Sequence, residues 1–143
     1  RQTAVDFYIL KAGGDLARQQ FACRLAEKAY RLENRVHIHV ASDDSAHKLD
    51  DLLWTFRDGS FVPHEILGSS TGDPDSPITI GCNDVPAGNC DLLINLGDTV
   101  PELAGSFPRV AEVVTSDEDC KTQSRQRFVD YREQGHTLET HNL

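Results

Sequence analysis

Hydrophobic residues recur along this chain in two spacings that largely alternate. Short runs rich in β-branched and aromatic residues predict strands at residues 3–11, 35–41, 78–80, 91–96 and 109–114. Between them, apolar residues three and four positions apart predict helices at residues 15–34, 42–54, 100–105 and 115–135. Residues 137–140 have the composition of a further edge strand.

Strands that alternate with helices imply right-handed crossovers between parallel strands. The sequence therefore predicts an α/β fold, with residues 1–143 forming a single domain. Its expected architecture is a mostly parallel, doubly wound, Rossmann-like sheet with helices on both faces. The pattern loosens at residues 55–76, and the stretch GSSTGDPDSP at residues 68–77 predicts a loop.

Helical spacing also predicts which side chains face the core. On the first helix these are Ala17, Phe21, Leu25, Ala29 and Leu32. On the second helix they are Ala46, Leu49, Leu53 and Trp54.

Composition narrows the possible partners. The chain has 14 Lys and Arg against 23 Asp and Glu, a net charge of −9, which argues against duplex DNA or an anionic membrane as a direct partner. No apolar run approaches the roughly 18 residues of a membrane span, so we expect a cytoplasmic protein. The four cysteines form no C-x-x-C pair and are expected to be free thiols. Because the chain starts at Arg1 and has no methionine, we expect a different natural N-terminus.

The sequence contains no common catalytic or cofactor-binding motif. The first strand-to-helix turn, at residues 11–15, matches neither G-x-x-x-x-G-K-[ST] nor G-x-G-x-x-G, and Asp15 would repel phosphate. His37 and His39 share one strand face, but no further ligand follows at metal-binding spacing. We therefore expect no catalytic residue, no cofactor and no metal. The alternative is an α/β nucleotide-binding domain or enzyme whose site is assembled from scattered residues.

The helix predicted at residues 115–135 carries a basic stripe. Thr115 or Ser116 is expected to cap its start, and Gly135 to end it in a left-handed conformation. At 100° per residue, Lys121, Arg125 and Arg132 fall within an arc of roughly 40°. Phe128 and Val129 border this arc. The stripe is typical either of a solvated helix face or of a surface for an acidic peptide with a hydrophobic anchor.

Several segments together resemble the chi subunit of bacterial DNA polymerase III holoenzyme. The most specific are LDDLLW at residues 49–54 and SFVPH at residues 60–64, in this order and spacing. FYIL at residues 7–10, DLLINL at 91–96 and RQRFVDYR at 125–132, followed by Gly135, extend the resemblance over essentially the whole chain. It implies a non-catalytic accessory subunit of the clamp loader, with two protein partners.

One implied partner is the psi subunit, which tethers chi to the clamp loader. The resemblance places the psi contact on Trp54, Phe61, Val62, Pro63 and His64. From the residues alone, Trp54 and Phe61 fit a core position equally well. An iron–sulfur helicase is implied as a competitor for this surface in some bacteria, and a chi-like protein without a psi partner is a further alternative.

The other implied partner is the acidic C-terminal tail of single-stranded DNA-binding protein, which ends in phenylalanine. The resemblance places its pocket on the last helix and the neighbouring strand. The residues concerned are Val114, Lys121, Arg125, Phe128, Val129, Arg132 and Gly135. Val129 departs from the family pattern, which has a lysine there. Loss of this cation is expected to weaken tail binding and its salt dependence unless Lys121 or Arg127 substitutes for it.

Overall fold

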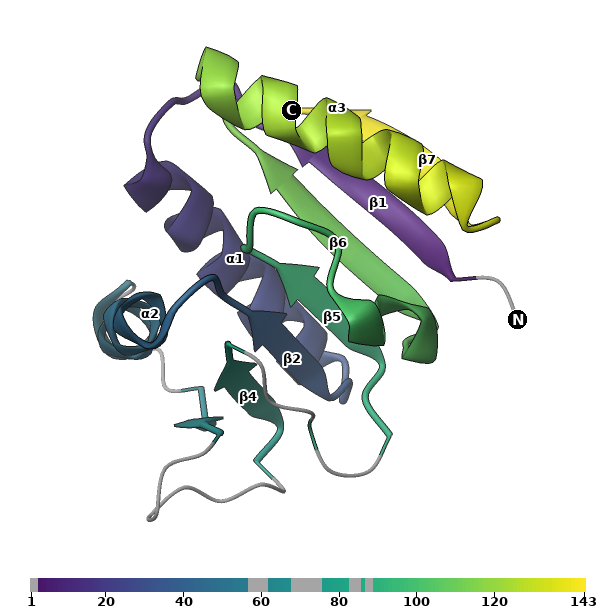
Figure 1. The fold of residues 1–143 in the computed structure, drawn as a ribbon. Coiled ribbons are helices and arrows are strands. Elements are labelled where there is room, and N and C mark those ends of the chain that lie inside the picture. Colours follow the sequence, from purple (N-terminus) through teal and green to yellow (C-terminus); the bar gives the residue numbers. More distant parts are fainter. Residues whose placement is uncertain (1–2, 57–61, 68–75, 83–85, 87–88) are drawn as a thin grey trace.

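The computed structural model describes residues 3–56, 62–67, 76–82, 86 and 89–143. These residues form one seven-stranded sheet with the strand order β3-β4-β2-β5-β6-β1-β7, and every neighbouring pair is parallel (Figure 1). In chain order the elements are β1 (Ala4–Ile9), α1 (Asp15–Arg31), β2 (Val36–His39), α2 (Asp43–Thr55), β3 (His64–Ile66), β4 (Ile78–Gly81), β5 (Leu92–Asn95), the 3-10 helix η1 (Glu102–Ser106), β6 (Arg109–Val114), α3 (Glu118–Glu133) and β7 (Thr137–Asn142).

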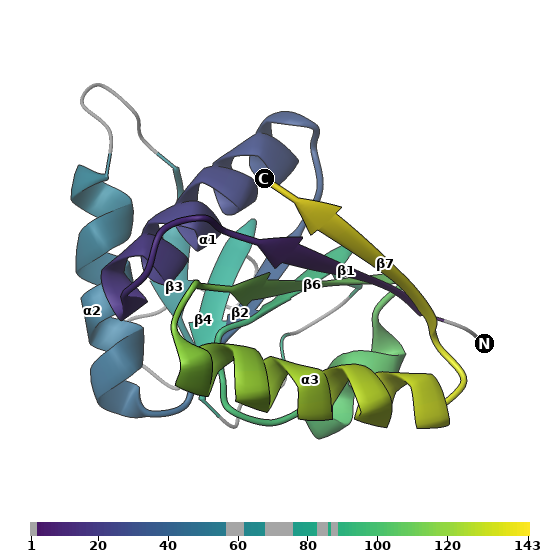
Figure 2. The same ribbon diagram turned by 90° about the horizontal axis from the view of Figure 1, so that it is seen from above.

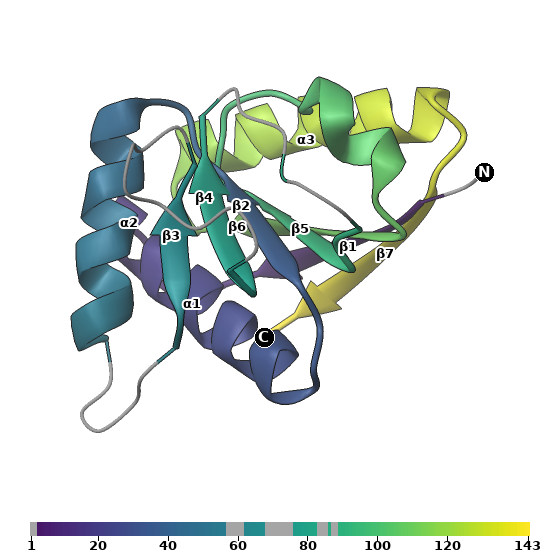
Figure 3. The ribbon, with the colours of Figure 1, turned by 90° about the horizontal axis from the view of Figure 1, so that it is seen from below.

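The helices cover both faces of the sheet. Figure 2 shows α1 and α2 on one side, while α3 runs along the other side, and Figure 3 shows η1 beside α3. Each face has its own cluster of buried apolar residues, one beneath α1 and α2 and the other beneath α3 and η1. The predicted doubly wound α/β sheet is thus confirmed.

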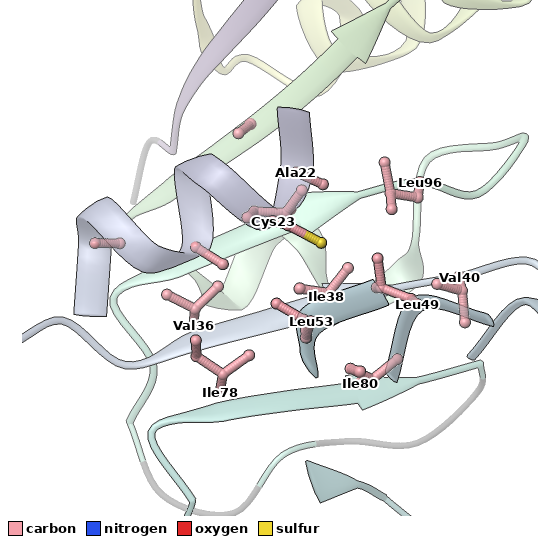
Figure 4. Packing of buried hydrophobic residues seen from close by; sticks show 14 of the residues in the cluster. Ala22, Cys23, Val36, Ile38, Val40, Leu49, Leu53, Ile78, Ile80 and Leu96 are labelled. Atoms are coloured by element: carbon pink, nitrogen blue, oxygen red, sulfur yellow. The ribbon is translucent and has the colours of Figure 1, made fainter. Parts of the chain in front are cut away.

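The larger core lies beneath α1 and α2 (Figure 4). Ile38 of β2 and Ile80 of β4 belong to one cluster with Leu53 of α2 and Cys23 of α1, all of them almost completely buried. Burying an aliphatic side chain of this size contributes about 1.5–3 kcal/mol. The small side chains of Ala22 and Cys23 are what α1 presents to the sheet, so that its backbone can approach closely.

The predicted core faces of the helices need correction. On α1, Ala29 is buried as expected, but Phe21 and Leu25 are only partly buried, and Leu32 is 65% exposed beyond the end of the helix. The buried stripe instead runs through small residues, which carry a weak hydrophobic signal in the sequence. On α2, Ala46, Leu49 and Leu53 are buried as predicted, whereas Trp54 is 54% exposed.

Most strands lie where the pattern predicts them, including the edge strand β7, which pairs with β1. One strand was missed. The segment His64–Ile66 forms β3 at the opposite edge, pairing with β4. Its three residues include a glutamate and are too short to give a period-two pattern. The predicted loop at residues 68–77 lies mostly outside the described residues.

Candidate functional site

Helix α3 carries most of the candidate site, and its start and end are both defined. The predicted caps Thr115 and Ser116 are wrong, because Asp117 occupies the N-cap position and the helix begins at Glu118. Asp117 Oδ2 instead accepts hydrogen bonds of 2.8 Å from the Gly14 backbone N–H and from Thr115 Oγ1. At the other end Gly135 has φ +84°, the left-handed stop that the sequence predicts.

A buried polar network fixes the face that α3 turns to the sheet. Glu112, at the middle of β6, accepts a 2.9 Å hydrogen bond from Arg127 Nε and a 2.7 Å bond from Asn95 Nδ2. The Tyr131 hydroxyl donates to the same carboxylate, and burial together with the Glu112 charge raises the pKa of Tyr131. A buried carboxylate without partners is costly. These hydrogen bonds therefore fix the orientation of α3 about its own axis.

In that orientation, the adjoining side of α3 and the edge of the sheet line a hollow of about 480 Å³. We call it the α3 pocket. It is bordered by α3, β1, β6 and β7, which lie side by side in Figures 1 and 2. Its lining residues are Phe7, Ile9, Val114, Lys121, Ser124, Arg125, Phe128, Val129 and Thr140.

The α3 pocket combines an apolar floor with cations. The rings of Phe7 and Phe128 meet with their centroids 5.3 Å apart and form, with Val114, the apolar part. The exposed Arg125 and the half-buried Lys121 contribute the positive charges. Lys121 Nζ lies 4.0 Å from Glu118 Oε1, a surface pair of small energy that leaves the ammonium available to another anion.

The second predicted surface is only partly exposed. Trp54 packs against His64 with ring centroids 4.9 Å apart in an edge-on arrangement. His64 is buried, where its Nδ1 donates a 2.6 Å hydrogen bond to the Val62 carbonyl, and Nε2 lies 3.1 Å from Asp50 Oδ1. Val62 is itself in the core. Trp54 and the half-buried Pro63 are therefore the members of this set that face solvent, and Phe61 lies outside the described residues.

Comparison with known proteins identifies the family. The family model described as "DNA polymerase III chi subunit, HolC" matches residues 3–139. The chain belongs to the chi family. Chi is a subunit of DNA polymerase III, so the chain is an accessory protein of DNA replication that associates with the polymerase III holoenzyme.

Curated chi subunits match along nearly their full length. The DNA polymerase III subunit chi of Pseudomonas aeruginosa is 40% identical over 141 residues, 99% of this chain and 97% of that protein. The chi subunit of Haemophilus influenzae is 36% identical, covering 96% and 95% of the two chains. The chi subunit of Escherichia coli is 30% identical, covering 94% of each.

A solved structure of low sequence identity has a similar fold. The C-terminal domain of the DEAD-box protein Dbp5 superposes with a TM-score of 0.59, covering 99% of this chain and 90% of that chain at 14% identity. This likeness concerns the arrangement of strands and helices alone. In the described part of the chain, no helix is long and apolar enough to span a membrane.

The α3 pocket brings together part of the set that the chi resemblance assigned to tail binding. Val114, Lys121, Arg125, Phe128 and Val129 line it, whereas Arg132 and Gly135 do not. Arg132 is exposed further along α3, and Gly135 follows the helix end. Arg127 cannot replace the family's lysine, because it is only 2% exposed and is bonded to Glu112.

Sequence reasoning missed the part of the α3 pocket that comes from the strands. Phe7 and Ile9 belong to β1 and Thr140 to β7, at opposite ends of the chain. The period of two along a strand predicts that Phe7 and Ile9 lie on one face of β1. Only the strand order shows that β1 and β7 are neighbours and that this face lies beside α3. Glu112 was also missed, although a carboxylate inside an apolar strand run signals that a buried partner must exist.

The carboxyl edge of the sheet, where doubly wound proteins bind ligands, holds an anion from the chain itself. The Gly14 backbone N–H at the start of α1 bonds Asp117, and this hydrogen bond is the main reason why the pKa of Asp117 is lowered. A Cβ on Gly13 would lie 2.9 Å from Ser116 Oγ, and Gly14 has φ +94°, a backbone conformation that favours glycine. The Gly13–Gly14 pair thus joins two loops.

Proposed function

We propose that this chain is the non-catalytic chi subunit that links the psi subunit of the clamp loader to the acidic C-terminal tail of single-stranded DNA-binding protein. The observation that carries the proposal is the α3 pocket, with cations beside an aromatic floor in a protein whose net charge is −9. It works without a cofactor, in the cytoplasm where replication takes place.

The chemistry of the α3 pocket matches a peptide that ends in phenylalanine. Phe7, Phe128 and Val114 offer an apolar surface to the terminal ring, and aromatic rings stack favourably at an offset or edge-on. Arg125 can donate two parallel hydrogen bonds to a carboxylate. The aliphatic stem of Arg125 covers the ring while its charged end stays in water.

Arg132 acts outside the α3 pocket. It follows Arg125 by two helical turns on the same side of α3, which places it about 10 Å further along the axis. An extended acidic tail that leaves the pocket can run along this side of the helix and pair with Arg132. Gly135 ends the helix at that point and gives the tail room to leave.

Trp54 and Pro63 anchor the proposed psi surface, together with Phe61, which lies outside the described residues. An exposed tryptophan held by a buried histidine is already ordered, so little conformational entropy is lost on binding. Val62 and His64 support this surface from inside the core and are not expected to touch psi directly. In bacteria with an iron–sulfur helicase partner, the same surface is expected to bind it in competition with psi.

The tail site is tested by fluorescence anisotropy with a labelled tail peptide. Arg125→Ala and Phe128→Ala should weaken binding by about three- to tenfold, within the range of single interface side chains. Arg24→Ala on α1 removes the same charge away from the α3 pocket and is the matched control. A peptide lacking its terminal phenylalanine should lose most affinity. Equal binding of both peptides would refute the aromatic part of the site.

Ligand-dependent thermal stability separates this function from the nucleotide-binding alternative. A ligand that binds only the folded state raises the melting temperature. The tail peptide should therefore raise it, while ATP and NAD should leave it unchanged. Stabilisation by a nucleotide and not by the peptide would favour the enzyme alternative.

A further inference from the structure

A second group of polar side chains lies on the face of the sheet opposite to α3, where β1 pairs with the edge strand β7. Asp6 stands directly opposite Glu139 in the β1–β7 register, and His141 follows two residues later, on the same face of β7. One ligand atom from each of the three side chains lies within 4.8 Å of the other two. Two strands thus bring two carboxylates and an imidazole together.

We propose that Asp6, Glu139 and His141 bind a divalent transition-metal ion such as Zn²⁺ or Mn²⁺. Asp6 Oδ1 and His141 Nε2 are 3.0 Å apart. Two ligands that each lie about 2.0–2.1 Å from a tetrahedral ion are separated by about 3.3 Å. An ion could therefore replace the hydrogen between Asp6 Oδ1 and His141 Nε2 with little movement of the two side chains. Imidazole and carboxylate ligands suit this class of metal.

Neighbouring residues already orient two of the ligands. Arg109 Nη2 donates a 3.0 Å hydrogen bond to Asp6 Oδ2, which leaves Oδ1 directed to His141. The ring of Tyr8 stacks on the ring of His141 at 5.0 Å between centroids and 18° between planes. Such outer contacts hold ligands in place and raise metal affinity. The two carboxylates and the guanidinium leave one net negative charge to attract a cation.

The arrangement is that of an open site. Asp6, Tyr8 and Arg109 also line a groove of about 420 Å³ beside the C-terminal half of α1, lined further by Lys28 and Asn34. Water or a small anion can reach an ion held by Asp6 from this groove and complete its coordination. Since the three ligands come from two strands, the ion would also fasten β7 to β1 and stabilise the folded chain.

Cobalt(II) is the probe for the test, because its visible absorption reports ligand type. The untagged protein should bind one equivalent, measured by calorimetry and by d–d absorption. His141→Asn and Glu139→Gln should each weaken binding by at least about tenfold. His47→Asn on α2 is the matched control, since it removes an exposed histidine far from the group and should bind like the parent. Zn²⁺ should raise the melting temperature of the parent and the control only.

Three results would overturn the proposal. The first is no binding by the parent up to about millimolar cobalt, well beyond the affinity of a three-ligand site. The second is undiminished binding by both His141→Asn and Glu139→Gln. The third is a thiolate-to-cobalt charge-transfer band, which would assign the ion to cysteine. Glu139 is exposed and His141 is 37% exposed, both on the edge strand β7, and circular dichroism verifies that the variants fold.

Discussion

The Tyr131 hydroxyl of α3 donates a 2.6 Å hydrogen bond to Glu112 Oε2 at the middle of β6. Both residues are completely buried, so this hydrogen bond replaces one that the carboxylate would otherwise make to water. It also holds the helix at the rotation that turns Lys121, Arg125 and Phe128 toward the α3 pocket. Stability and the shape of the pocket therefore depend on the same side-chain contact.

Tyr131→Phe should lower the free energy of unfolding by about 1–3 kcal/mol, because it leaves one oxygen of a buried carboxylate with a lost partner. Urea unfolding measures the change. Tyr30→Phe on α1 removes a hydroxyl away from the network and should have a smaller effect. If the two variants unfolded alike, the network would not be what fixes α3.

Val129→Lys should strengthen binding of the acidic tail peptide. Val129 lines the α3 pocket, and a lysine there adds a cation next to the bound carboxylates. One exposed ion pair is worth about 0.2–1 kcal/mol, so a gain of up to about fivefold is expected at low salt, with a steeper loss as salt rises. Thr122→Lys adds the same charge to an exposed position of α3 outside the pocket lining and should gain less.

The protein should lose stability as the pH falls from about 6.5 to 4. Burial lowers the pKa of His37 from 6.5 to about 4, with His39 as the second cause, so the folded chain keeps this ring neutral while the unfolded chain takes up a proton. The unfolded state thus binds more protons in this window, and about 2 kcal/mol should be lost between pH 7 and pH 5. The lowered pKa of His39 acts in the same direction.

Unfolding of the His37→Asn variant at pH 7 and pH 5 isolates this contribution. Asparagine can keep a hydrogen bond to Thr79 Oγ1, which lies 2.8 Å from His37 Nδ1, but it does not titrate. The difference in unfolding free energy between the two pH values should shrink in the variant. His47→Asn, at an exposed position, should leave the difference as it is in the parent.

Trp54→Ala should weaken the complex with psi by at least about tenfold, as expected for an aromatic anchor, and change the stability of the isolated chain little. The side chain is 54% exposed, and its described ring contact is with His64. Leu16→Ala removes a residue that is 58% exposed on α1 and is the control. Co-purification and calorimetry with psi measure the effect, and an intact complex in both variants would move the psi site elsewhere.

Local pattern predicted the strand and helix content because burial on both faces makes strands such as β5 and β6 largely apolar. It misassigned the core face of α1, because the residues that meet the sheet there are alanine and cysteine and not the larger Phe21 and Leu25. The short strand β3 offered too few residues for a pattern. These failures have a common cause. A hydrophobic pattern is recognised mainly from large apolar side chains and needs a stretch of several residues.

The candidate site was accessible to sequence reasoning only along α3. Helical spacing put Arg125 and Lys121 on one side, and the α3 pocket lies on that side. Spacing also put Arg132 with them, although the pocket ends before it. The contribution of Phe7 depends on β1 lying between β6 and β7, which is a property of strand order. The burial of Arg127 depends on Glu112, and no local pattern links the two.

The strand order also determines when β1 can pair with its neighbours during translation. β1 is translated before the other described strands, whereas both of its partners, β6 and β7, are translated after β2, β3, β4 and β5. Val5 and Phe7 therefore stay exposed to solvent until β6 and α3, which pack against them, have been translated. A chain released before β6 is made lacks both strand partners of β1 and the helix α3 that covers Phe7. The proposed binding of an acidic tail to the α3 pocket thus requires synthesis through Thr140 of β7.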